Sequence, residues 1–267
     1  MKNYFKYAIS NEFISNVLKI TSSTMISGII VAITLPIITK IFTASELGKY
    51  QLIVSIITSL GVISALKYEM AIVLPKNDAI AKIVYKICFY VLITFCLLLS
   101  ILFFFVDSII FNYLNAENIL NFSKLIPIGV FFFGALEIIK SSLVRGKKFS
   151  SFSLAKVYQI ASTQILIIVI GLINASTISL LIAFISGIII SSIIFVKKSI
   201  IEVKSEISDS LLDIALKYKK FPLVNTFMVF SNTISNELPV FFIMKYHSSE
   251  ILGFYMLANR LLVIPMN

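Results

Sequence analysis

Charged side chains within long apolar segments are the residues of this sequence that could do chemistry. Arg260 lies well inside a run that begins near Ile251, and its planar guanidinium can hold a phosphate through two parallel hydrogen bonds. Glu237 lies deep in another run, where it could take up a proton or an ion, or pair with Arg260 or a neighbouring amide. Lys19 enters the first run, where it could meet an anionic group or reach the membrane surface. A charge in lipid is costly, so each is a candidate functional residue.

Two pairs of opposite charge have a simpler local interpretation. Glu137 and Lys140 are spaced so that both side chains lie on one face of a helix, where they can form an ion pair. Lys67 and Glu69 lie near the end of an apolar run. They are expected either at the membrane interface or as part of a gate at an inner opening.

Other site chemistries find little support in the sequence. His247 is the only histidine, which excludes a zinc site built on several histidines. Cys88 and Cys96 lie too far apart along one predicted helix to form a disulfide. No phosphate-binding glycine loop and no nucleophile motif stands out. We therefore expect no catalytic residue, no metal and no cofactor, with H⁺ or Na⁺ as the candidate coupling ion.

The composition indicates which elements position these residues. Hydrophobic residues make up 58% of the 267 residues and charged residues only 13%, whereas soluble domains carry about 25% charged residues. Such a chain cannot cover a water-facing surface, which excludes a soluble enzyme, and it is too hydrophobic to be disordered.

Long apolar runs predict an all-α, polytopic membrane protein. About 20 apolar residues suffice for one spanning helix, and the runs lack the alternation of β-barrel strands. Seven complete spans and the start of an eighth are expected, at 20–39, 50–66, 87–106, 125–144, two within 157–196, 221–244, and from 251 onward.

The distribution of positive charge predicts how the spans are oriented. The net charge is +10, and most basic residues fall in the N-terminal segment and in every second loop. The positive-inside rule places these segments, and the N-terminus, in the cytoplasm. Because the charge is divided among short loops, nucleic acid is not an expected partner. The longest loop, 200–216, is expected to be an amphipathic helix at the interface, or else a solvated linker.

An internal repeat predicts the domain organisation. Leu35-Pro36-Ile37 followed by Leu47-Gly48 reappears as Leu238-Pro239-Val240 followed by Leu252-Gly253. Each proline should kink its helix, and an offset of six spans makes the repeat parallel. We expect a six-helix bundle at 1–196, a cytoplasmic amphipathic linker at 197–220, and the start of a second bundle at 221–267, which Asn267 leaves incomplete through truncation, a frameshift or a fragment boundary.

Several motifs resemble those of a known family. They are Leu47-Gly48-x-Tyr50, Lys67-Tyr68-Glu69-Met70-Ala71-Ile72-Val73-Leu74-Pro75, Arg145-Gly146-Lys147-Lys148-Phe149, Tyr218-Lys219-Lys220-Phe221-Pro222, Ser235-Asn236-Glu237-Leu238-Pro239 and Leu252-Gly253-Phe254-Tyr255-x-Leu257-Ala258-x-Arg260-Leu261-Leu262-x-x-Pro265. This set resembles the O-antigen, capsule and teichoic-acid exporters called Wzx-type flippases, which share a superfamily with multidrug extruders. In the motif that begins at Lys67, this lysine replaces the Arg that is usual in the family. In the motif that begins at Ser235, Glu237 stands where relatives often carry an uncharged amide.

The resemblance implies a function as well as a fold. It implies two helical bundles around a central cavity, in the bacterial cytoplasmic membrane. The substrate would be an undecaprenyl-diphosphate-linked oligosaccharide, moved between leaflets by alternating access for lipopolysaccharide O-antigen or capsule synthesis. A polysaccharide polymerase and a chain-length regulator would be partners. The alternatives are a multidrug or lipid II exporter of the same superfamily, a non-functional truncated fragment, or a membrane enzyme, which the short outer loops disfavour.

Overall fold

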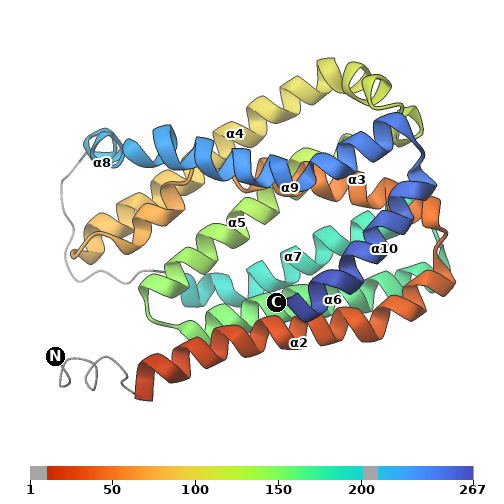
Figure 1. Cartoon of the computed structure of the whole chain (residues 1–267). Coiled ribbons are helices and arrows are strands. Elements are labelled where there is room, and N and C mark those ends of the chain that lie inside the picture. The colour runs from red at the N-terminus through yellow and green to blue at the C-terminus, as the bar shows by residue number, and fades with distance from the viewer. Residues whose placement is uncertain (1–10, 201–209, 267) are drawn as a thin grey trace.

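The computed structural model describes residues 11–200 and 210–266, and this part of the chain is almost entirely helical (Figure 1). It contains no β-strand, so the predicted all-α fold is confirmed. The helices are α2 (Asn11–Ile41), α3 (Ala44–Gly61), α4 (Asp78–Tyr113), α5 (Leu125–Arg145), α6 (Phe149–Ile173), α7 (Thr177–Ser199), α8 (Leu211–Lys217), α9 (Thr226–Tyr246) and α10 (Ser249–Met266). Two 3₁₀ segments, η1 (Tyr68–Val73) and η2 (Glu117–Phe122), and a π-helical turn, η3 (Phe221–Asn225), connect them.

Six of these helices are long and apolar enough to cross a membrane, so the chain is a multi-pass membrane protein. They are α2, α4, α5, α6, α7 and the η3–α9 segment. The longest, α4, has 36 residues and extends about 54 Å at 1.5 Å per residue, well beyond a hydrocarbon core of about 30 Å. α3 and α10 occupy the other expected positions, but both are short and carry charged residues in their first half.

The second expected span begins earlier than the hydrophobic run that predicted it. The hydroxyl of Thr43 accepts a hydrogen bond from the backbone N–H of Glu46 at 3.3 Å, and the Glu46 carboxylate accepts one from the N–H of Thr43 at 2.9 Å. This capping box starts α3 at Ala44 rather than at residue 50. The helix ends at Gly61, and left-handed backbone at Leu66 and Lys67 then leads the chain into η1.

The two copies of the internal repeat meet where α3 crosses α10. The hydroxyls of Ser45 and Ser249 share a hydrogen bond of 2.7 Å. A Cβ atom on Gly48 would collide with the carbonyl of Ser249, and one on Gly253 would collide with the carbonyl of Ala44. The spacing of small residues is therefore the same in both helices, and it lets their backbones touch as small-xxx-small motifs do in membranes. Both repeat prolines, Pro36 and Pro239, lie within continuous helices, α2 and α9.

The linker prediction can be examined only in part, because residues 201–209 lie outside the described residues. Residues 197–199 complete α7, and the described remainder forms the short helix α8. Ile214 is buried in the main core, and the hydroxyl of Tyr68 donates to the carbonyl of Ala215 at 3.1 Å. The described part of the linker therefore packs against the bundle and is not a freely solvated connection.

Candidate functional site

A cavity of about 420 Å³ opens between α2, α3, α6, α7 and α10, and we call it the cationic cavity. Four of these helices contribute side chains at helical spacing and α7 contributes Phe184, so the cavity depends on how the helices face one another. The lining residues are Thr24, Ser27, Gly28, Val31, Tyr50, Gln51, Val54, Lys156, Gln159, Ile160, Thr163, Gln164, Phe184, Tyr255, Met256, Asn259 and Arg260.

Two cations face this space without a neutralising carboxylate. Arg260 comes from α10 and lies beside the Tyr50 hydroxyl, while Lys156 comes from α6 and donates to the hydroxyl of Thr24 at 2.9 Å. No acidic residue lines the cavity, and among the described residues no carboxylate oxygen lies within 4.0 Å of either cation. The cavity therefore has a net positive charge and favours an anion.

Amides and aromatic rings complete the wall. The buried amide of Gln164 accepts a hydrogen bond from the Thr34 hydroxyl at 3.2 Å, which fixes its orientation. Tyr50 packs edge-on against Phe184 with ring centroids 6.2 Å apart, so its position is also fixed. A wall of hydroxyls, amides and rings can bind a ligand with many hydroxyl groups, and the cations can bind its anionic part.

Glu237 lies on α9 and reaches α3 rather than Arg260. The hydroxyl of Ser55 donates to its carboxylate at 2.5 Å, and the amide of Gln51 donates to the oxygen of Ser55 at 3.2 Å. Of the expected alternatives, pairing with Arg260 is not seen among the described residues, where Ser55 is the partner of the carboxylate. Since Gln51 also lines the cationic cavity, a chain of two hydrogen bonds links the cavity wall to this half-buried carboxylate.

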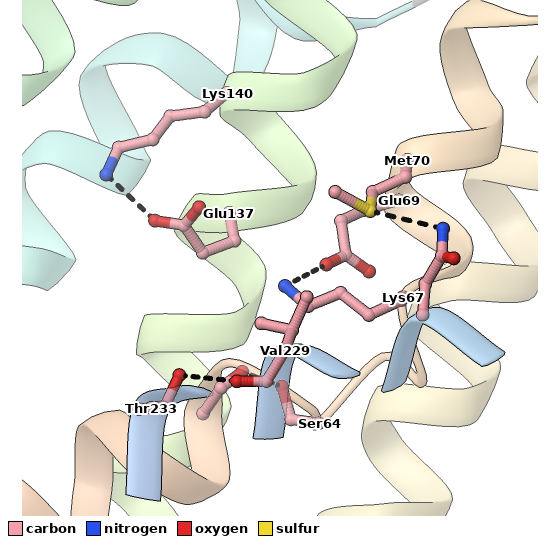
Figure 2. Close-up of polar contacts among 10 residues, drawn as sticks. Ser64, Lys67, Glu69, Met70, Glu137, Lys140, Val229 and Thr233 are labelled. Atoms are coloured by element: carbon pink, nitrogen blue, oxygen red, sulfur yellow. Dashed lines mark hydrogen bonds and ion pairs between the residues drawn. The ribbon is translucent and has the colours of Figure 1, made fainter. Parts of the chain in front are cut away.

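Four of the five remaining predicted charges form two ion pairs beside each other, shown in Figure 2. We call Lys67, Glu69, Glu137 and Lys140 the paired-charge cluster. The ammonium of Lys67 lies 3.0 Å from the Glu69 carboxylate, and that of Lys140 lies 3.0 Å from Glu137. Lys67 and Glu69 are both buried within the protein, and their placement at the membrane interface or at an inner gate stays a prediction. Lys140 also donates to Gln159 at 3.5 Å, which connects the cluster to the cavity wall.

Glu69 is incompletely satisfied. One carboxylate oxygen bonds Lys67, while the other is buried with no hydrogen-bond partner among the described residues. Burial raises the pKa of the Glu69 carboxyl, the nearby charge of Glu137 adds to the rise, and Lys67 opposes it.

Lys19 is not brought together with the other candidates. Its side chain is exposed on α2, donates weakly to Asn16 at 3.4 Å, and does not line the cationic cavity.

Lys156 and the amide-bearing residues of α6 were not among the sequence candidates. Lys156, Gln159, Thr163 and Gln164 form a polar stripe at helical spacing within a largely apolar helix. That stripe is visible in the sequence and marks a helix face turned away from lipid. By contrast, no sequence pattern indicates that Ser55 meets Glu237, because the contact joins residues 182 positions apart.

Comparison with known proteins identifies the group to which the chain belongs. No curated protein and no solved structure matches it. The model of a family described as polysaccharide biosynthesis protein matches residues 37–267, which include the capping box of α3, the paired-charge cluster, both repeat helices α9 and α10, and most of the cavity wall. The chain therefore belongs to the polysaccharide biosynthesis protein family.

Proposed function

We propose that this protein is a flippase that moves an undecaprenyl-diphosphate-linked oligosaccharide across the bacterial cytoplasmic membrane. The observation that carries the proposal is the cationic cavity, whose described lining residues include two cations, Lys156 and Arg260, and no carboxylate. A diphosphate needs cations to leave water, and its lipid tail can remain in the bilayer. The volume, about 420 Å³, lies within the usual range of ligand sites, about 300–1,000 Å³.

The remaining features support a transport cycle without an enzymatic step. The crossing of α3 and α10 joins the two repeat copies through small residues, which suits bundles that rock against each other. Glu237 is held by one hydroxyl from the other repeat copy, so uptake of H⁺ or Na⁺ there would alter a contact between the copies. A cytoplasmic N-terminus, and a polymerase and chain-length regulator as partners, belong to the same proposal.

A drug exporter is the weaker alternative. Many exported drugs are cations, and a cavity with two unneutralised cations would repel them. A lipid II exporter would share the diphosphate chemistry, and cell lysis on depletion of the protein would distinguish it from an exporter of surface glycans.

Arg260→Ala tests the proposal. In a strain whose surface glycan depends on this protein, the variant should abolish glycan export while the protein remains in the membrane at the normal level. Arg260→Lys should retain part of the activity, because it keeps the charge but loses the fork. Lys19→Ala is the matched control, since it removes an exposed cation outside the cavity and should leave export normal. Normal export by Arg260→Ala would overturn the proposal.

A further inference from the structure

A second cavity, of about 430 Å³, lies where α5 and α7 end and α4 begins, and we call it the lysine pocket. Its lining residues are Val73, Asp78, Ser142, Arg145, Gly146, Lys148, Lys197, Lys198, Ser199 and Ile200. They include four cations and one acid. All three helices are candidate membrane spans, so the pocket lies at the level where spans meet the membrane surface.

The single acid among the described lining residues, Asp78, is already neutralised. Arg145 lies 2.7 Å from the carboxylate of Asp78, and its guanidinium also donates to the carbonyls of Ile72 and Pro75 at 2.9 and 2.7 Å. Arg145 thus fastens the segment between η1 and α4 and is not free to bind a ligand. The charge available to a ligand comes from Lys148, Lys197 and Lys198.

Two of the helix-end carbonyls that would repel an anion are also occupied. A helix ends with unpaired carbonyls and a partial negative charge, which disfavours anions. Here Lys148 donates to the carbonyl of Lys198 at 2.8 Å, and Ser142 donates to that of Ser199 at 2.5 Å. Lys197 and Lys198 are exposed, and in the described part of the chain no carboxylate lies within 4.0 Å of their ammonium groups.

The surroundings of the lysine pocket are those of a lipid rather than of a dissolved ion or a sugar. Val73 and Ile200 line it and are about half exposed, as is neighbouring Leu74, and Ile193 on α7 is 67% exposed. Among the residues that the structure describes, no aromatic ring and no side-chain amide lines this pocket, whereas the cationic cavity has both.

We propose that the lysine pocket binds the phosphate headgroup of an anionic phospholipid of the phosphatidylglycerol class. The phosphate lies against Lys148, Lys197 and Lys198, and the acyl chains run along the exposed apolar side chains. Basic groups near a membrane surface each contribute about 1 kcal/mol to binding of anionic lipid, and three lysines line this pocket. The site is separate from the cationic cavity and does not depend on the transported substrate.

The test is to measure the phospholipid that remains bound to the purified protein. The protein is taken from bilayers of equal phosphatidylglycerol and phosphatidylcholine, and native mass spectrometry counts each lipid retained. Wild type should retain phosphatidylglycerol, and the triple variant Lys148→Gln, Lys197→Gln, Lys198→Gln should lose at least about tenfold in retention. The triple Lys→Arg variant should retain it. The control Lys217→Gln, Lys219→Gln, Lys220→Gln makes the same charge change on exposed residues elsewhere and should behave as wild type.

Further measurements distinguish a phospholipid from other phosphate-bearing ligands, and loss of binding from loss of folding. Inorganic phosphate at equal concentration should not displace the phospholipid, and displacement would overturn the proposal in favour of a soluble anion. Preferential retention of undecaprenyl phosphate through the same lysines would overturn it in favour of the substrate. If the triple Gln variant is unstable, Lys197→Gln with Lys198→Gln preserves the Lys148 bond to α7 and should still lose retention several-fold. Equal retention by wild type and this double variant would also overturn the proposal.

Discussion

The cationic cavity and the paired-charge cluster both contain basic side chains, but these side chains differ in whether a carboxylate lies beside them. In the cavity, Lys156 and Arg260 belong to a wall whose described residues include no carboxylate. In the cluster, Lys67 and Lys140 each lie 3.0 Å from a glutamate. A cation that already has its counter-ion stabilises the fold and has little attraction left for a ligand, whereas a cation without one retains it. The difference teaches that pairing, more than position within an apolar run, separates binding residues from structural ones.

The largest expected effect is on the folding of the cluster. Lys67→Ala leaves the Glu69 carboxylate buried without its ion-pair partner, and breaking a buried pair on one side costs about 3–5 kcal/mol. The free energy of unfolding in detergent, measured by denaturant titration, should fall by that amount. The double variant Lys67→Ala, Glu69→Ala should recover much of the loss because it leaves no lone charge. Equal stability of Lys67→Ala and wild type would show that the pair is not structural.

Next in size is the effect of removing a cavity cation. Lys156→Met keeps the length of the side chain but removes a charge that would bind the diphosphate. A hydrogen bond to a charged group contributes about 1.5–3 kcal/mol, so export should fall about tenfold or more, while unfolding should be nearly unchanged. Export is measured as surface glycan per membrane-inserted protein. If Lys156→Met lost stability but exported glycan normally, Lys156 would be a structural residue rather than a binding residue, contrary to the distinction drawn between the two regions.

Lys140→Ala should have a smaller effect that falls between the two regions. Its pair with Glu137 is only partly buried, so the expected loss of stability is about 0.2–1 kcal/mol. Lys140 also holds Gln159 in the cavity wall, and its removal should weaken export modestly. Comparison with Lys140→Gln, which keeps a hydrogen-bond donor, separates the effect on export from the effect on stability. Recovery of export without recovery of stability would show that the export effect acts through Gln159.

The helices themselves could be predicted from the sequence, because a membrane-spanning helix requires only a continuous local run of apolar residues. All eight expected spans correspond to helices, and the i,i+3 pairing of Glu137 with Lys140 is confirmed. The start of α3 was missed because a capping box, not hydrophobicity, sets it. The partner of Glu237 could not be predicted, because Ser55 is one of many hydroxyls in spans and only helix packing selects it.

The smallest effect concerns pH and belongs to the cluster alone. Burial raises the pKa of the Glu69 carboxyl above its usual value of about 4.3, with Glu137 adding to the rise and Lys67 opposing it. The folded protein therefore holds this proton at pH values where the unfolded chain has released it. Stability from this group is fully present below about pH 4.3 and is lost as pH rises through the raised pKa. Unfolding measured across this window should show that loss in wild type and in Lys156→Met, but not in Glu69→Gln. The same slope in Glu69→Gln would show that Glu69 is not the group that holds this proton.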